Sequence, residues 1–569
     1  MARIVHQLMA IRTKDRLNRL VLLIPVLFLL SFYFFPMIKI AYRSLMQTDS
    51  LFALKGENMR IAWRSIRFSF LQAFLSTVIT ACLGVPAAYL FGRFIFPGRK
   101  IMRLISTLPF ILPTVVVAAA FNALVGKNGW INLFLMRFFD LSQAPIQLFG
   151  TLGAILLAHV FYNTSIFIRV VGTAWERLDT NTEDAARVLS ASPWQTFKKV
   201  TFPLLLPSIL SAVLLVFLFD FTSFGVILLM GGAQFATIEV EIYIQTTQFL
   251  NLRLAGLLSL IQLFFSIITA LISKRLDNAP FVPIIPASIE KALRKPDTRR
   301  KKIFVFFING ILVILIAMPL GALILRSVLT SENIGSYGTL DFSLANYQRI
   351  FVNERDALFF VPPFTALRNS ILFALAAMAI SIIMAICVAV GSSWSSRAGK
   401  IIDVFVMLPL GTSAVTLGLG FLLAFSASRA MVAYFPVLIP IVHSLIALPI
   451  VVRIIQPALQ AIPSNQHDAA ITLGVPYARL WWKLDLPMIK KPLITAAIYA
   501  FAVSLGEFGA TTFLSRPEIP TLPVAIFRYI GLPGQENYGK AMAMAVILLL
   551  ACTAGFVAIE NLQDIPVRE

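Results

Sequence analysis

The sequence predicts an all-α integral membrane protein whose twelve transmembrane helices form two parallel six-helix repeats. Three observations predict this fold: an apolar composition, twelve apolar stretches of bilayer-spanning length, and an internal repeat that covers most of the chain. Of the 569 residues, 58% are hydrophobic and 13% are charged, and the mean hydropathy is +0.84. A water-soluble domain of this length needs more polar surface, so the composition indicates a polytopic membrane protein.

The helices follow from the apolar stretches, because a bilayer core requires about 20 apolar residues per helix. In the first half these stretches are 20–42, 66–91, 101–126, 152–172, 204–229 and 252–273. In the second half they are 303–326, 369–392, 401–427, 433–453, 488–513 and 541–560. No A-x-A-like cleavage site stands out after the first stretch, so we interpret it as an uncleaved membrane helix and not a signal peptide.

A basic segment, 274–302, separates the two sets of helices. It holds nine Lys and Arg residues against three acids, and four prolines interrupt it. The positive-inside rule predicts a cytoplasmic linker. With six helices per half, the tails 1–19 and 561–569 then lie on the cytoplasmic side as well. The net charge of +21 is spread over loops between apolar stretches, which argues against nucleic-acid binding.

Cysteine and histidine residues are few and scattered. The three cysteines lie far apart in apolar stretches, so no disulfide framework is predicted. The four histidines and the cysteines show no metal-ligand spacing, and no metal site is predicted. His159 and His443 are expected to pack or hydrogen-bond between helices.

A polar block occurs twice at an offset of 284 residues. Its first copy contains Asp184, Ala185, Ala186, Leu189 and Ser190, and Pro203 and Pro207 follow. Its second copy contains Asp468, Ala469, Ala470, Leu473 and Gly474, and Pro487 and Pro492 follow. The same offset relates His159 to His443 and Thr237 to Thr521, while upstream it becomes 300, which leaves about sixteen extra residues within 127–150 of the first half. An even number of helices per half makes this a parallel repeat.

Both blocks follow the fourth helix of their half, in segments 180–200 and 464–484, so they are predicted to be cytoplasmic. The two alanines and the leucine of each block share one helical face. Small side chains allow a short helix to enter a partner's groove, and the leading acid favours a helix N-terminus and can pair with an arginine. An ordinary interfacial helix would explain one copy, but not two with identical internal spacing. The prolines either begin the next helix or act as a rigid lever.

Two acids, Asp220 and Glu507, lie inside apolar stretches on matching helices of the two halves. An ionisable side chain is costly in lipid and usually faces a cavity or a partner. One interpretation is that both acids line a pathway for a cationic substrate. The other is that each caps or pairs within its helix bundle.

On these residues the chain resembles the permease subunits of bacterial ABC importers. The two blocks look like two copies of that family's cytoplasmic "EAA" loop, with Asp in place of Glu. Ser190 replaces the family's Gly in the first copy, and because Ser tolerates a left-handed backbone less well, the turn there is expected to differ. Two copies in one chain resemble the fused permeases of thiamine and ferric-iron import, and 68–76, 156–161 and 234–239 are similar to the thiamine type.

The resemblance implies a transport subunit, not an enzyme, with no cofactor of its own. Two copies of a separate ATPase would use ATP and bind 180–200 and 464–484, since the chain has no Gly-x-x-x-x-Gly-Lys-Ser/Thr loop. A substrate-binding protein would dock on the outer loops 230–251 and 514–540 and deliver thiamine or ferric iron. The permease repeats would be 20–273 and 303–560, in a bacterial inner membrane.

The main alternative is a secondary transporter driven by an ion gradient, because two parallel six-helix halves also fit that class. Asp220 and Glu507 are compatible with it, but it gives no reason for the doubled block. A structural membrane scaffold explains neither the block nor the acids.

Overall fold

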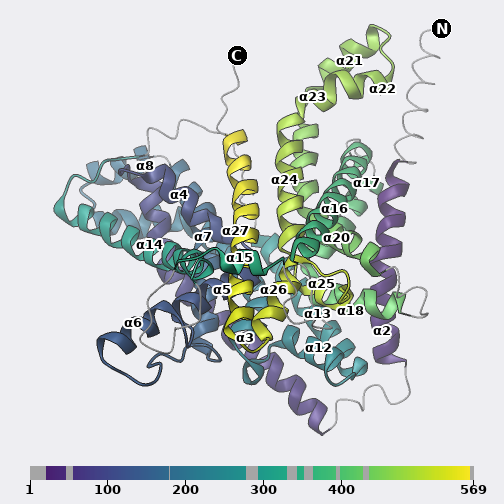
Figure 1. Cartoon of the computed structure of the whole chain (residues 1–569). Helices are drawn as coiled ribbons and strands as arrows, with labels where there is room; N and C mark the ends of the chain where they lie inside the picture. The colour runs from purple at the N-terminus through teal and green to yellow at the C-terminus, as the bar shows by residue number, and fades with distance from the viewer. Residues whose placement is uncertain are drawn as a thin grey trace. The chain divides into compact units, whose positions relative to one another are not determined.

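The computed structural model describes residues 21–46, 56–178, 180–276, 293–329, 342–351, 363–392, 397–426 and 435–563 (Figure 1). Within these ranges the chain is helical, and its extended pairings are isolated bridges instead of strands. The tail 1–19, residues 277–292 of the linker and the end of the C-terminal tail fall outside the described residues, as do the side chains of several loop residues, including Asp468.

The first half begins with a helix from Val21 to Leu45 that contains a π turn. Its elements, in order, are η1 Leu30–Phe34, α2 Phe35–Leu45, α3 Glu57–Arg93, α4 Arg99–Thr107, η3 Leu108–Ile111, α5 Thr114–Val125, α6 Trp130–Phe138, α7 Leu152–Arg177, α8 Thr180–Val188, α9 Pro193–Thr196, η4 Phe197–Thr201, α10 Phe202–Phe221, α11 Gly225–Met230, η5 Ala233–Phe235, α12 Ile238–Thr247 and α13 Leu252–Leu276.

The second half repeats most of this order. Its elements are α14 Arg299–Ser327, α15 Ala345–Arg349, α16 Pro363–Ser392, α17 Arg397–Met407, η7 Leu408–Gly411, α18 Ala414–Phe425, α20 Phe435–Gln460, α21 Ser464–Thr472, α22 Tyr477–Leu480, η8 Trp481–Asp485, α23 Leu486–Met488, α24 Lys490–Gly506, α25 Gly509–Leu514, α26 Leu522–Gly531 and α27 Gln535–Gln563.

Ten helices among the described residues have the length and composition to cross a membrane, and two bent pairs raise the number to twelve if each pair is one span. One pair, Ile401–Gly411 and Ala414–Phe425, bends by 100°, and the other, Trp481–Met488 and Lys490–Gly506, bends by 66°. These helices confirm the all-α membrane fold. The interruptions were not predicted.

The third predicted stretch, 101–126, is not one continuous helix. It breaks after η3, where Leu112 is extended, and α5 starts after Pro113. Proline lacks an N–H and disfavours a helical residue before it, so this break has a local cause. The span found in this part of the chain is Thr114–Phe138.

Packing divides the chain into two units that differ from its two sequence halves. Unit 1 comprises residues 1–51, 353–525 and 550–569, and unit 2 comprises 52–352 and 526–549. In unit 1, α16 packs with α20 and α24, and α2 packs on α18. In unit 2, α3 packs along α7, α10 contacts both, and α14 packs on α5. The first helix of each half therefore belongs to the unit built mainly from the other half.

Helix α3 shows which kinds of residue face the other helices and which are exposed. Its buried face is lined mostly by small and polar residues, with Leu90 and Phe91 near its C-terminal end, whereas large apolar side chains such as Trp63 and Phe74 are exposed. This is the reverse of a water-soluble helix and is the arrangement expected of a helix that faces lipid, where small residues let helices approach closely.

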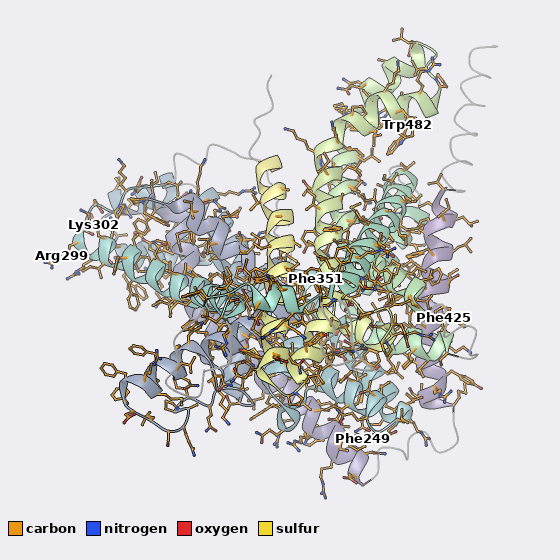
Figure 2. The ribbon with its side chains drawn as sticks, in the orientation of Figure 1. Phe249, Arg299, Lys302, Phe351, Phe425 and Trp482 are labelled. Carbon is orange, nitrogen blue, oxygen red and sulfur yellow. The ribbon has the colours of Figure 1, made fainter. Side chains whose placement is uncertain are left out.

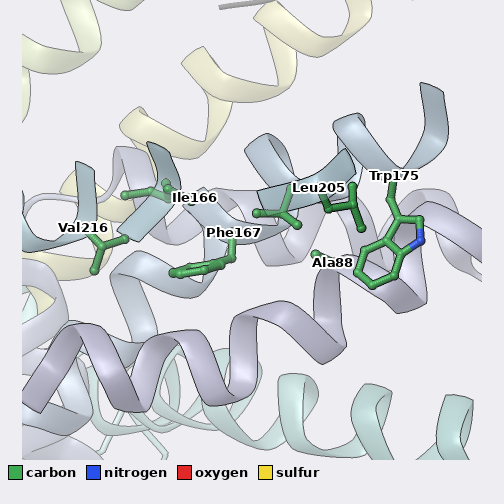
Figure 3. Packing of buried hydrophobic residues seen from close by; sticks show 8 residues of the cluster. Ala88, Ile166, Phe167, Trp175, Leu205 and Val216 are labelled. Carbon is green, nitrogen blue, oxygen red and sulfur yellow. The ribbon is translucent and has the colours of Figure 1, made fainter. Parts of the chain in front are cut away.

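Gly84 is one of the positions at which α3 approaches α7 closely. A Cβ atom at this position would lie 2.6 Å from both Cβ and Cγ of Phe167. Phe167 belongs to the buried cluster of Figure 3, with Ala88, Trp175 and Leu205 among its members. Any side chain larger than hydrogen at position 84 therefore pushes against the backbone end of Phe167.

We expect Gly84→Ala to lower the free energy of unfolding of the purified chain by about 1–3 kcal/mol, the usual cost of overpacking a well-packed core. Gly310→Ala in α14 is the matched control, because a Cβ there meets no atom within 4 Å. Thermal unfolding in detergent measures both variants. Equal melting temperatures of the two variants would show that the α3–α7 contact accommodates the added methyl group without loss of stability.

Candidate functional site

The first candidate loop folds as a short helix, α8, followed by a tight turn. The N–H of Ser190 donates to the carbonyl of Arg187 (2.9 Å), and the N–H of Ala191 donates to that of Ala186 (3.1 Å). These two bonds form a Schellman motif, which places residue 190 in the left-handed conformation. Ser190 adopts it, with φ of 62°.

The second loop ends its helix, α21, in the same way. Gly474 has φ of 75°, and the N–H of Val475 donates to the carbonyl of Ala470 (3.1 Å). The expectation of a different turn at Ser190 was therefore wrong. The backbone bonds of the motif hold Ser190 in a conformation that costs a non-glycine residue about 1 kcal/mol.

The turn gives a direct test. Ser190→Gly should slow hydrogen exchange across 180–201 by about fivefold, and Gly474→Ser should speed exchange across 464–485 by about fivefold, because about 1 kcal/mol changes an opening equilibrium by that factor. Hydrogen–deuterium exchange with mass spectrometry measures both segments in each variant, so each unchanged loop serves as the other's control. Opposite signs would contradict the strain at Ser190.

Both loops present an exposed leucine at the same repeat position. Leu189 and Leu473 are each 82% exposed. Trp194 and Trp482 follow them in the sequence and are also exposed, and Figure 2 shows Trp482. In unit 1, α21 and α22 project beyond the end of α24 (Figure 1). Leu189 and Leu473 lie on polar segments outside the candidate membrane spans, where exposed large apolar side chains are typical of a protein-binding surface.

The acid of the first loop, Asp184, is half-exposed and lies near two arginines of this chain. Its carboxylate is 3.5 Å from Arg187 and 3.3 Å from Arg294, which belongs to the linker. Backbone bonds between Arg294 and both Arg93 and Ile95 hold this part of the linker against the end of α3. The linker thus reaches the first candidate loop.

Each loop is followed by a π turn at an equivalent position. These turns are η4 and η8, and each is closed by a bond between residues five apart, from Phe202 to Phe197 and from Leu486 to Trp481. Pro203 and Pro487 come next. Because a π turn is wider than an α turn, it accommodates the proline ring, which would otherwise clash with the carbonyl four residues earlier.

After the prolines the two copies differ. The helix runs from Pro193 to Phe221 as one span, with Pro207 inside it, whereas the second copy breaks at Ile489 with the 66° bend just before Pro492. Pro203 and Pro487 each lie in the first turn of the α-helical segment that follows the π turn, α10 and α23.

The sequence analysis missed two pairs of side chains, one in each copy, that connect the loop helix to its π turn. Glu183 accepts a hydrogen bond from Thr201, and His467 bonds Asp485. The offset of 284 that relates the loops also relates Glu183 to His467 and Thr201 to Asp485. Comparison of polar residues at that offset would have found them.

Glu507 lies just after α24, where it caps α25. Its carboxylate accepts from the backbone N–H groups of Ala510 (2.8 Å) and Thr511 (3.0 Å) and from the Thr511 hydroxyl (2.5 Å). The His443 Nε2 is 3.1 Å away. Three hydrogen bonds thus hold this buried carboxylate, and His443 Nε2 also bonds the Thr511 hydroxyl, which is the arrangement expected of a structural cap.

Asp220, at the end of α10, has fewer partners. Asn163 donates to Oδ1 at 2.6 Å, and His159 Nδ1 is 3.4 Å from the same oxygen. The other carboxylate oxygen, Oδ2, is buried and has no hydrogen-bond partner among the described residues. A buried acceptor without a partner is uncommon, and it often marks a site with a role beyond packing.

His159 and His443 occupy equivalent positions, and each lies between an acid and a serine. The position that holds the acid in one half holds the serine in the other half. His159 lies between Asp220 and Ser223, with its Nε2 2.9 Å from the serine hydroxyl. His443 lies between Glu507 and Ser504, with its Nδ1 2.7 Å from that hydroxyl. Each histidine joins the fourth helix of its half to the end of the fifth.

The predicted outer loops contain the short helices α12 and α26. The first backbone N–H of each helix donates to a serine hydroxyl. Ile238 donates to Ser69 (2.9 Å), and Leu522 donates to Ser370 (2.7 Å). These helix starts are buried, so a docking surface there would use the more exposed residues that follow, such as Phe249. Among the described residues, no group of three or more His, Cys, Asp or Glu side chains could hold a metal ion.

Comparison with known proteins bears on this arrangement. The family model described as "Binding-protein-dependent transport system inner membrane component" matches residues 81–278 and 377–564, which together exceed half of the chain. The thiamine transport system permease protein ThiP of Escherichia coli strain K12 is 26% identical over 513 residues, covering 88% of this chain and 89% of that protein. Its counterpart in Salmonella typhimurium is 28% identical over 516 residues, with 88% and 89% covered, and that in Haemophilus influenzae is 27% identical over 536 residues, with 91% and 93% covered.

Proposed function

Since the chain belongs to the family of binding-protein-dependent transport system inner membrane components, with one family segment in each half, we propose that it forms the complete membrane pathway of an ABC importer for thiamine. It is a multi-pass membrane subunit that transports and is not itself an enzyme. The observation that carries the proposal is the pair of loops, because they share sequence spacing, left-handed turn and an exposed leucine at one repeat offset.

Each loop binds one copy of a separate ATPase subunit. Leu189 and Leu473 enter an apolar groove of that subunit, and the small side chains at 185–186 and 469–470 let the helix sit close to it. Asp184 exchanges its contact with Arg294 for an arginine of the ATPase, since the present pair is exposed and solvent screens it. ATP-driven closure of the two ATPases then draws the loops together and opens the pathway outward.

The loops, both tails and the linker lie in the cytoplasm of a bacterial cell. The basic linker supports this orientation, by the positive-inside rule. A thiamine-loaded binding protein then docks on the opposite face, where segments 230–251 and 514–540 lie. Retention of a fluorescent binding protein by outward-facing proteoliposomes tests this orientation, and retention only by inverted ones contradicts it.

The two intramembrane acids have different roles in this proposal. Glu507 is committed to its helix cap. Asp220 retains an unpartnered oxygen that attracts the cationic cargo when the pathway opens, because an unpaired carboxylate in a low-dielectric site favours a cation. Asp220→Asn should therefore reduce thiamine uptake about tenfold or more at unchanged protein level. Uptake within twofold of wild type would remove Asp220 from the pathway.

The experiment for the whole proposal is uptake of radiolabelled thiamine by cells that lack this chain. Uptake should be lost, should return with the wild-type chain, and should stop when ATP is depleted while the membrane potential is kept. Ferric-iron uptake in the same cells is the control for cargo. If cells without the chain lose iron uptake alone, the cargo is ferric iron and not thiamine. Uptake that follows the ion gradient without ATP would support a secondary transporter.

A further inference from the structure

Each loop helix is joined to its following π turn by a side-chain bond, which is buried in the first copy and partly buried in the second. In the first copy the Thr201 hydroxyl donates to Oε1 of Glu183 at 2.9 Å. In the second copy His467 Nε2 lies 2.8 Å from Oδ1 of Asp485. Since a carboxylate accepts, the histidine ring donates through Nε2–H.

The two bonds occupy one structural position with their chemistry reversed. Glu183 and His467 lie in the loop helices α8 and α21, and Thr201 and Asp485 are the last residues of the π turns η4 and η8. In copy one the carboxylate is on the loop helix, and in copy two it is on the π turn. Two unrelated donor–acceptor pairs at one position indicate that the bond itself matters more than either residue type.

Burial strengthens the first bond fully and the second in part. Glu183, Thr201 and Asp485 are all less than one-tenth exposed, whereas the side chain of His467 is 26% exposed. Arg93, at the end of α3, also donates to Oε1 of Glu183 at 2.5 Å and attaches the first bond to a membrane helix. A charge-assisted bond away from water contributes more than an exposed one, and the loss of one partner leaves the other buried and unsatisfied.

The position of each bond gives it a mechanical effect. The loop helix and the next helix form a hairpin around the turn at 190–192 or 474–476, and the bond crosses the open end of that hairpin. A nine-residue helix such as α8 is marginal alone and would swing about its turn when pulled. A bond at the open end resists this motion with the longest lever arm.

We propose that Glu183–Thr201 and His467–Asp485 are two equivalent cross-braces that transmit the movement of each loop helix to the membrane helix that follows it. This inference rests on the proposed function, because it concerns how the loops pass on the motion of the ATPase. The four residues are positioning residues and need not touch the ATPase or the cargo.

The second copy allows an exchange experiment, because the described residues show no counterpart there of the Arg93–Glu183 bond. His467→Glu places two carboxylates face to face and breaks the brace. Adding Asp485→Thr gives this position the Glu–Thr pair of copy one and should restore it. Gln466→Glu is the matched control, since it adds the same charge at an exposed neighbouring position of α21.

The first measurement is hydrogen exchange of 464–485 in the purified chain, which depends on neither cargo nor ATPase. His467→Glu should raise exchange about tenfold, while the double variant and Gln466→Glu stay within about threefold of wild type. Unchanged exchange in His467→Glu, or no recovery in the double variant, would overturn the brace.

The second measurement compares thiamine uptake with ATP hydrolysis in membranes that hold the ATPase. His467→Glu should retain the ATPase and its hydrolysis but lose uptake about tenfold, and the double variant should regain it. Loss of ATPase retention in His467→Glu would contradict a transmission role. If the wild type itself takes up no thiamine, the proposed cargo fails, while hydrogen exchange still decides whether the brace exists.

Discussion

Replacement of Leu189 and Leu473 together by Asp is expected to abolish retention of the ATPase subunit. Each leucine is 82% exposed in the isolated chain, so nearly all of its apolar surface is available for burial by a partner. Full burial of a leucine contributes about 1.5–3 kcal/mol, so loss of both should weaken binding at least about 100-fold. Co-purification of the ATPase with the tagged chain measures this directly.

Leu250→Asp is the control for this experiment. Leu250 is also strongly exposed, but it lies in the loop between α12 and α13, which the proposed orientation places on the opposite face. The control should retain the ATPase fully. If the double variant retains it as well, the two loops are not the binding sites. If Leu250→Asp loses it, the proposed orientation is wrong.

The second large effect is expected at Glu507. Glu507→Ala removes the acceptor for the N–H groups of Ala510 and Thr511 and for the hydroxyl of Thr511, and it leaves His443 without its carboxylate. Buried donors without acceptors cost about 1–3 kcal/mol each, so the free energy of unfolding should fall by about 3 kcal/mol or more. Thermal unfolding of the purified chain measures the loss.

Two variants sharpen this prediction. Glu507→Gln keeps the shape and one acceptor oxygen, so it should fall between wild type and Glu507→Ala. Glu518→Ala removes an exposed acid from the same unit and should leave the melting temperature unchanged. A Glu507→Ala variant as stable as Glu518→Ala would show that the cap contributes nothing and would restore Glu507 as a candidate for the pathway.

The repeat was the most informative feature of the sequence. It located both loops, paired Asp220 with Ser504 and Ser223 with Glu507, and indicated parallel halves. The family match to both halves bears out the repeat, and the helices bear out the membrane fold. The same offset also relates Glu183 to His467 and Thr201 to Asp485, but the residue types differ between the copies, so a search for identical residues does not reveal these pairs.

The turn at Ser190 shows where residue preferences fail. Glycine is favoured in the left-handed region by about 1 kcal/mol, and two backbone hydrogen bonds of the Schellman motif outweigh that preference. The bend between η7 and α18 is a second case in which the residue type at one position does not decide the local structure. Position 413 holds Ser where the first half has Pro113, yet both halves break there, because Ser413 caps α18 instead.

The sequence by itself predicted most of the apolar helices and which loops are paired, because hydropathy and an internal repeat can be read from the order of the residues. The tertiary structure decided which helices bend, which unit receives α2 and α14, and which buried acid is fully hydrogen-bonded. Those outcomes depend on contacts between distant residues, such as Asn163 with Asp220 and Arg93 with Glu183. The free energy of a buried polar group is set by the partners around it, and no local pattern of residues specifies those partners.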